Sequence, residues 1–243
     1  MIWLWRIFFS GLWVLTAWCA NVSGTVVLAD SRSPAVRRHK DFSGVVVWLA
    51  PAEPSAKGAL STSGLPPQRT QMAQKDKHFF PHVLAIPVGA AVEFPNFDPI
   101  FHNAFSNYSG QLFDVGLYPP GTSRTVVFKR PGIVRVFCNI HPTMSAVIAV
   151  LDTPWFAVSR VSGEYQIRGV PEGDYQLHIF HERAAEETLN ALVRRVRVED
   201  TAPLVLPPIT ISETGYIPAP HKNKWGKDYP PVIDDQPAYP AKP

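Results

Sequence analysis

The chain has 243 residues, of which 46% are hydrophobic and 18% are charged, enough to build one large or two small globular domains with apolar cores. The formal net charge is only +3 and the lysines and arginines are scattered, which excludes the basic face that a nucleic-acid partner requires. With 25 prolines, 15 glycines and short apolar runs rich in Val, Ile and Phe, the composition predicts an all-β chain with frequent turns.

The first 20 residues are typical of an export signal. Arg6 precedes an apolar run at residues 7–17 that closes on small residues, and this run is short for a membrane span. We therefore expect cleavage near Cys19 or Ala20 and a periplasmic or other extracytoplasmic location. The alternative is an uncleaved signal that anchors the chain; apart from such an anchor we expect no membrane contact.

Cleavage there would leave Cys138 as the only cysteine of the exported protein. No intramolecular disulfide is then expected. A lone thiol in an oxidising compartment is open to oxidation and mispairing unless it is buried or bound to a metal.

Strand-forming runs alternate with turn residues along most of the chain. Residues 24–29 and 44–49 predict two strands, and the Pro-, Gly- and Ser-rich residues 53–67 predict a linker. Beyond the linker, two strands on either side of a turn at Gly89 and two more on either side of Pro131 and Gly132 are followed by one more strand. This spacing is typical of a Greek-key sandwich or barrel.

The pattern changes after this region. Residues 164–180 alternate polar and apolar side chains around a Pro-Glu-Gly-Asp turn, which predicts a β-hairpin. Residues 182–192 predict a short helix or an acidic loop, and residues 194–200 and 204–211 predict further strands. From Ser212 on, a tail rich in Pro, Lys and Tyr predicts an extended segment, either on the surface or mobile in solvent.

One thiol, one imidazole and one thioether occur at three-residue intervals in Cys138, His141 and Met144. Soft sulfur ligands together with imidazole select copper, and two histidines and one cysteine with a weak axial Met form a blue electron-transfer site. His102, after a predicted strand well upstream, is the best candidate for the second imidazole. The sequence therefore predicts one type 1 copper per chain, although Met144 taken alone could also be a core residue.

The spacing of these residues has a physical reason. Cys138 closes a predicted strand, a tight turn stiffened by Pro142 returns His141 to the same point, and Met144 opens the next strand. A short, pre-shaped loop changes little between Cu(I) and Cu(II), which suits electron transfer.

The segments "FFPHVLAIPVGAAVEFPNFDPIFHNAFS" and "CNIHPTM" resemble the cupredoxins of the plastocyanin and amicyanin type. The resemblance covers residues 68–151 and implies a Greek-key cupredoxin sandwich. It also implies that Asn103 ties the first-ligand loop to the cysteine loop, by bonding backbone near Asn139. The segment "FDVGLYPPGTS" resembles exported cupredoxin-like proteins related to methylamine utilisation, which concerns a pathway and is weaker than the metal assignment.

The flanking segments "NVSGTVV", "FSGVVVWLAP" and "SGEYQIRGVPEGDYQLHIFHE" resemble the two halves of a carboxypeptidase-regulatory-like, transthyretin-type β-sandwich of the immunoglobulin-like kind. We expect the cupredoxin domain to be inserted into this smaller sandwich; the alternative is that residues 21–50 pack elsewhere. The predicted organisation is a signal (1–20), first strands of the smaller sandwich (21–52), a linker (53–67), the cupredoxin domain (68–151), the rest of the smaller sandwich (152–211) and a Pro-rich tail (212–243).

Four other histidines come in two pairs. His78 and His82 have no accompanying Cys or carboxylate cluster, so we interpret them as surface or strand-end residues. His178 and His181 are three apart in a predicted strand and point to opposite faces, so we interpret them as structural.

These features predict a one-electron carrier that makes transient contacts with exported dehydrogenases or c-type cytochromes. The expected contact patch consists of His141, Pro142, Pro99 and Ile100. Two alternatives stay open: copper buffering or delivery, which the scarcity of Met disfavours, and recognition of a partner or carbohydrate by the smaller sandwich. Catalysis is not expected, because a four-ligand site leaves no open position for a substrate.

Overall fold

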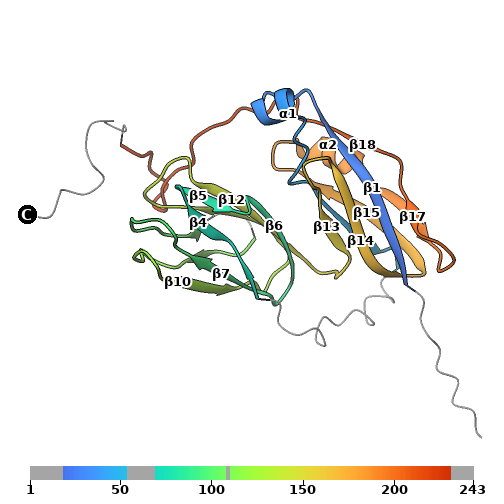
Figure 1. Cartoon of the computed structure of the whole chain (residues 1–243), viewed down its shortest axis with the longest axis horizontal. Helices are drawn as coiled ribbons and strands as arrows, with labels where there is room; N and C mark the ends of the chain where they lie inside the picture. Colours follow the sequence, from blue (N-terminus) through green and yellow to red (C-terminus); the bar gives the residue numbers. More distant parts are fainter. Residues whose placement is uncertain (1–18, 54–68, 108–109, 231–243) are drawn as a thin grey trace, which may run out of the picture.

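The computed structural model describes residues 19–53, 69–107 and 110–230 and shows two β-sandwiches side by side (Figure 1). The predicted signal up to residue 18, nearly all of the predicted linker and residues 231–243 lie outside this described part. Cys19 and Ala20 already belong to the first strand, β1 (Cys19–Ala29). Among the described residues there is no helix with the length and apolar character needed to cross a membrane.

The first sandwich is built from two sheets that contain residues 69–151. One sheet has the order β6 (Val83–Pro87), β12 (Ser145–Leu151), β11 (Gly132–Phe137), β8 (Phe105–Ser106) and β9 (Phe113–Asp114). The other has the order β10 (Ser123–Val127), β7 (Ala91–Pro95) and β3 (Arg69–Gln71), with β4 (Ala73–Lys75) and β5 (His78–Phe80) as a separate pair. β12 pairs antiparallel with β11, the strand before it, and in parallel with β6, which is distant in sequence. The all-β prediction is confirmed.

The core of this sandwich forms where alternate side chains of the sheets meet. Phe79, Phe94, Phe128 and Ile148 are almost completely buried in it, and such burial supplies most of the stabilisation of a small sandwich. Cys138 and Met144 belong to the same apolar cluster, so the predicted copper loop lies against the end of a packed core.

The second sandwich joins residues from both sides of the first one in sequence. One sheet contains β14 (Glu164–Pro171), β1, β17 (Leu204–Val205) and β18 (Ile209–Ser212); the other has the order β13 (Phe156–Val158), β2 (Val46–Pro51), β15 (Gly173–Phe180) and β16 (Arg194–Val198). β1 pairs with β14 and β2 with β15. The immunoglobulin-like or transthyretin-type name for this sandwich stays a prediction.

The predicted β-hairpin at residues 164–180 is wrong. β14 pairs with β1, where Tyr165 lies opposite Gly24, whereas β15 lies between β2 and β16 in the other sheet. Period-two alternation is the same for two paired strands and for two strands facing each other across a core, because every second side chain points inward in both cases. Gly24 is needed in this packing, since a Cβ there would lie 2.5 Å from the Tyr165 hydroxyl oxygen.

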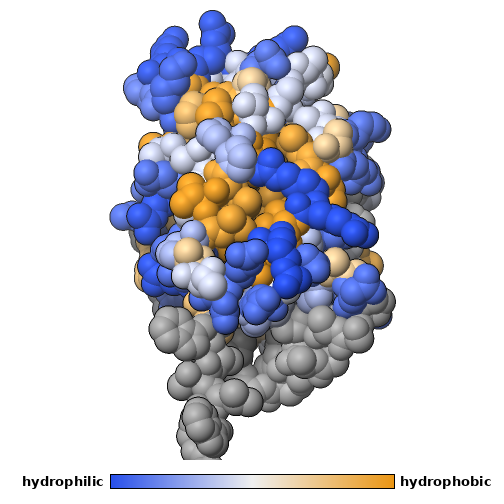
Figure 2. Space-filling view, turned by 90° about the vertical axis from the view of Figure 1, so that its right-hand side faces the viewer, coloured by the Kyte–Doolittle hydropathy of each residue, from blue (hydrophilic) through white to orange (hydrophobic). Residues whose placement is uncertain are grey.

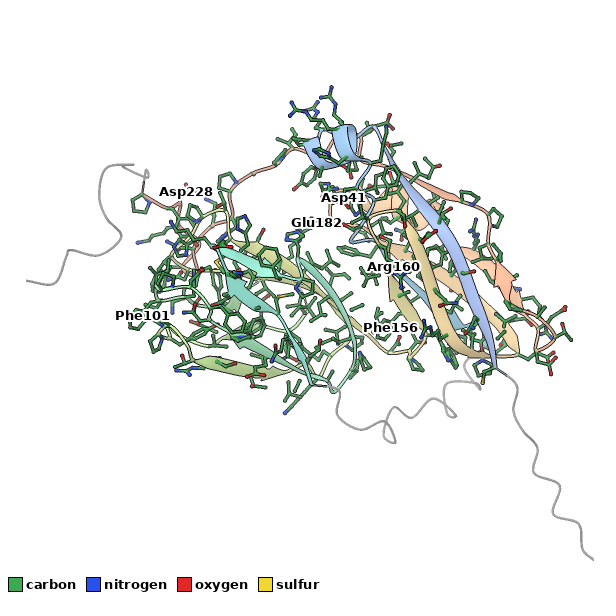
Figure 3. All side chains as sticks on the ribbon, in the orientation of Figure 1. Asp41, Phe101, Phe156, Arg160, Glu182 and Asp228 are labelled. Atoms are coloured by element: carbon green, nitrogen blue, oxygen red, sulfur yellow. The ribbon has the colours of Figure 1, made fainter. Side chains whose placement is uncertain are left out.

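The two sandwiches meet along an apolar seam. Its buried residues are Val46, Val83, Val147, Ala149 and Leu151, and Figure 3 shows Phe156 and Glu182 along it. Two short helices, α1 (Pro34–His39) and α2 (Glu186–Ala191), belong to the second sandwich (Figure 1). Figure 2 looks at the side of the molecule where β17 lies and shows an apolar area in its middle, bordered by hydrophilic side chains.

Candidate metal centre

The loop from Cys138 to Met144 connects two antiparallel neighbours. β11 ends at Phe137, which lies opposite Ser145 at the start of β12. Inside the loop, the Cys138 N–H donates to the Met144 carbonyl at 3.1 Å and the Met144 N–H donates to the His141 carbonyl at 3.1 Å. Both ends of the loop are therefore held by the sheet and its middle by its own hydrogen bonds.

His102 is positioned by a separate loop between β7 and β8. Its backbone exchanges two hydrogen bonds with Tyr118, of 3.2 and 2.9 Å, and its side chain is fully buried. Asn96 shapes the loop, because its Oδ1 accepts from the Asp98 N–H at 3.0 Å and its Nδ2 donates to the Ile100 carbonyl at 2.8 Å.

These two loops bring three of the predicted ligands together. The ligand atoms of His102, Cys138 and His141 all lie within 4.8 Å of one another, the only such group of His, Cys, Asp or Glu within the described residues. Cys138 Sγ is 3.5 Å from His141 Nδ1 and 3.7 Å from His102 Nδ1. One sulfur and two ring nitrogens can thus face a common ion.

Met144 is the fourth predicted ligand. Its side chain is fully buried in the cluster that contains Cys138. Its backbone carbonyl accepts from the Cys138 N–H and its N–H donates to the His141 carbonyl. This placement fits an axial thioether and also fits a core residue, so axial ligation by Met144 stays a prediction.

The carboxylate of Asp98 orients the buried imidazole. Nε2 of His102 lies 2.6 Å from Asp98 Oδ2, so Nε2 carries the proton and the lone pair of Nδ1 faces the sulfur. Asp98 also accepts the N–H groups of Asp76 and Lys77 at 2.6 and 2.9 Å. Burial alone would raise the pKa of Asp98, but these hydrogen bonds outweigh it and keep that pKa below its usual value.

Burial also shifts the pKa values of Cys138 and His141. Burial raises the pKa of the Cys138 thiol, while the N–H groups of Ile140, Asn103 and His141 face the sulfur and act in the opposite direction. Burial, followed by the nearby His102, lowers the pKa of His141 to about 4. An unprotonated imidazole at position 141 is therefore ready to bind a metal at neutral pH, and metal binding there would release the thiol proton.

Asn103 does not make the contact that the resemblance implied. Its Nδ2 donates to Asp114 Oδ1 at 2.7 Å and to the Gly116 carbonyl at 3.0 Å, because β9 pairs with β8 and brings Asp114 beside it. The link to Asn139 is indirect. Lys224 Nζ lies 2.7 Å from Asp114 Oδ2, and the Lys224 N–H donates to Asn139 Oδ1 at 2.9 Å.

Asp98, Asp114 and the residues around Lys224 were not among the predicted site residues. Asp98 stands four residues before His102, a spacing that offers a signal only once His102 is taken as a ligand. The tail offers only a local density of aromatic and basic side chains.

The four histidines of the two pairs noted in the sequence have different surroundings. His78 Nδ1 contacts the Asp76 carbonyl at 2.7 Å, and His82 pairs with Glu182 at 2.7 Å. His178 stacks on Trp48, with ring centroids 5.2 Å apart. His181 is buried and contacts Glu213 at 2.9 Å.

The chemistry of the three donor atoms indicates which metal ions the site can hold. A buried thiol and two imidazoles whose Nδ1 atoms face it provide one soft and two borderline ligands, which suit copper and do not suit magnesium or calcium. The two-sheet sandwich and this donor set agree with the resemblance to the cupredoxins found in the sequence. Residues 69–151 form a cupredoxin-like domain.

Comparison with known proteins gives partial matches. No family model matches the chain. The chain is 43% identical over 56 residues to the methylamine utilization protein MauL of Methylorubrum extorquens, a match that covers 23% of this chain and 49% of that protein. The chain thus spans about half the length of the curated relative it matches.

Three solved structures resemble part of the chain. A purple cupredoxin from Nitrosopumilus maritimus is 24% identical, with a TM-score of 0.32. The match covers 35% of this chain and the whole length of the purple cupredoxin. The copper-containing nitrite reductase of Thermus scotoductus is 28% identical, over 42% of this chain and 27% of that one, with a TM-score of 0.34. An amicyanin variant is 15% identical, over 37% of this chain and 88% of that one, with a TM-score of 0.33.

Proposed function

We propose that this chain is an exported type 1 copper protein that carries one electron at a time between redox proteins outside the cytoplasm. The observation that supports this most is the convergence of Cys138 Sγ with the Nδ1 atoms of His102 and His141. When bound there, copper supplies a centre that is reduced and oxidised reversibly by one electron.

The residues of the chain provide what such a centre needs. His102 and Cys138 are buried, so water is kept from the donor atoms. The loop bonded to both strand ends resists distortion, which keeps the reorganisation on electron transfer small. His141 is partly exposed, so its outer edge is the natural point at which an electron leaves or enters.

The surface near the two ligand loops suits a transient contact. Ile140, beside His141, and Phe101, beside His102, are 38% and 43% exposed. Phe97 is 63% exposed in the same loop as Phe101. We extend the predicted contact patch with these three residues and propose exported dehydrogenases or c-type cytochromes as partners, because small apolar contacts suit short-lived redox encounters.

We also propose a role in methylamine utilisation, supported by the likeness to the protein of that name over 56 residues. Catalysis by this chain is not part of the proposal, since four protein ligands would leave copper no open position. The export signal and extracytoplasmic location belong to the same proposal and are supported by the sequence of residues 1–20.

Electron transfer to a second protein tests the carrier role. The copper-loaded chain is reduced, mixed with an oxidised c-type cytochrome, and followed by stopped-flow absorbance. We expect a bimolecular reaction that Ile140→Glu slows about tenfold without a change in the visible spectrum. Val161→Glu is the matched control, because Val161 is 59% exposed and belongs to the second sandwich. Cu(I) that is bound but cannot be oxidised by the cytochrome would instead indicate copper handling.

A further inference from the structure

The chain crosses from the second sandwich back to the copper loop near its C-terminus. After β18 it runs over the top of the molecule to the cupredoxin-like domain (Figure 1), and Figure 3 shows Asp228 at the same end of that domain as Phe101. We refer to residues 221–229 as the C-terminal strap.

Three hydrogen bonds join the strap to the loop. The Tyr229 hydroxyl donates to the Cys138 carbonyl at 2.8 Å, and His221 Nε2 donates to the His141 carbonyl at 3.1 Å. Between them, the Lys224 N–H donates to Asn139 Oδ1 at 2.9 Å. Two of the three acceptors are the backbone carbonyls of predicted copper ligands.

The strap is itself well braced. The His221 ring stacks on Phe137, with centroids 4.4 Å apart, and packs edge-on against Tyr229 at 5.3 Å. Asn223 Oδ1 accepts the N–H groups of Trp225 and Lys227 at 3.0 Å each, which closes a turn inside the strap. These contacts fix the conformation of the strap, so the strap can restrain the loop to which it is hydrogen-bonded.

The strap also reaches the loop that carries His102. Lys224 Nζ pairs with Asp114 at 2.7 Å, and Asp114 accepts from Asn103, the residue after His102. One short segment thus connects both ligand loops.

We propose that the C-terminal strap is a positioning element of the metal centre and that Tyr229 is its main positioning residue. By holding the carbonyls of Cys138 and His141, it keeps the loop in its metal-binding shape before copper arrives. Such preorganisation strengthens binding, because less ordering remains to be done when the ion enters. This inference rests on the proposed copper function. Residues 213–220 connect the strap to β18 of the second sandwich.

The test compares Tyr229→Phe with Tyr175→Phe in the full chain. Tyr175 is a matched control because its hydroxyl donates to the Pro171 carbonyl at 2.9 Å, in the second sandwich. In the copper-free protein, we expect Tyr229→Phe to speed amide hydrogen exchange at Cys138 and Met144 about two- to tenfold. In the loaded protein, we expect Tyr229→Phe to bind Cu(II) more weakly by a similar factor and to shift the reduction potential. In Tyr175→Phe we expect the amide exchange, the Cu(II) affinity and the reduction potential to equal those of the wild type.

Unchanged exchange, affinity and potential in Tyr229→Phe would overturn the proposal. If the wild type shows no thiolate-to-copper absorption, the proposed function fails, and the exchange data on the copper-free chain still decide whether the strap positions the loop. Should Tyr229→Phe not fold, His221→Phe makes the same test, since it keeps a ring against Phe137 and removes the donor to His141.

Discussion

Asp98 accepts a 2.6 Å hydrogen bond from Nε2 of His102, and this contact turns the opposite ring nitrogen toward Cys138. The carboxylate is in turn held by the backbone N–H groups of Asp76 and Lys77. A charged, hydrogen-bonded partner of this kind fixes the tautomer of a ligating histidine and makes the ring a better donor. The candidate site therefore extends beyond its ligands to the turn that contains Asp76.

Replacing Asp98 with Asn is expected to weaken copper binding. The amide keeps the shape of the side chain but removes the charge, and its NH₂ group would face the backbone donors of Asp76 or Lys77. Loss of such a partner lowers metal affinity by roughly 10- to 100-fold, measured by competition with a chelator. Asp174→Asn, at an exposed ion pair with Arg197, is the control, and equal affinities of the two variants would contradict the role of Asp98.

Met144→Leu separates an axial ligand from a core residue. If the thioether binds copper, its loss removes a donor that favours Cu(II), so the reduction potential rises while the thiolate-to-copper band persists. Met72→Leu is the matched control, because Met72 is also fully buried in the same apolar cluster. Voltammetry gives the potentials; the same potential in both variants would show that Met144 only fills the core.

Much of the site could be read from the sequence because metal chemistry restricts residue types. Cys138, His141 and Met144 lie in one short loop, and a strand before His102 made it a reasonable partner. The structure brings the ligand atoms of His102, Cys138 and His141 together. Asn103 was assigned the wrong partner because the position of Asp114 depends on how β9 pairs with β8, which no local pattern encodes.

The fold and the strap show where local patterns fail. The all-β class follows from composition, yet β14 and β15 were expected to pair, since alternation does not distinguish paired strands from facing ones. The strap has no periodicity, and its acceptors lie far away in sequence, 91 positions between Tyr229 and Cys138. Only tertiary structure could reveal its contacts.

The ion pair between His82 and Glu182 is expected to make stability depend on pH. The hydrogen bond to Glu182 raises the pKa of His82 above its usual 6.5. Burial would raise the pKa of Glu182, but the bond to His82 outweighs it and lowers that pKa below 4.5. The contribution of His82 to the free energy of unfolding is complete below pH 6.5 and disappears as the pH rises through the raised pKa of His82. The contribution of Glu182 disappears as the pH falls through the lowered pKa of Glu182.

His82→Gln should therefore reduce the free energy of unfolding most at pH values between the lowered pKa of Glu182 and the raised pKa of His82. We expect about 1 kcal/mol or less, because the His82 side chain is 47% exposed and solvent screens the pair. Arg183, 3.6 Å from Glu182, and Glu213 beside Arg183 are unchanged in the variant. Urea unfolding at about pH 5.5 and about pH 9 measures the difference. His78→Gln is the control, and an equal loss at both pH values would argue against the ion pair.

The most direct measurement is the visible absorption and electron paramagnetic resonance of the full chain titrated with Cu(II), beside Cys138→Ser. A copper-bound thiolate predicts a strong charge-transfer band and a narrow hyperfine splitting at one copper per chain, with both lost in the serine variant. A colourless wild-type protein, or a spectrum that Cys138→Ser leaves unchanged, would contradict the account.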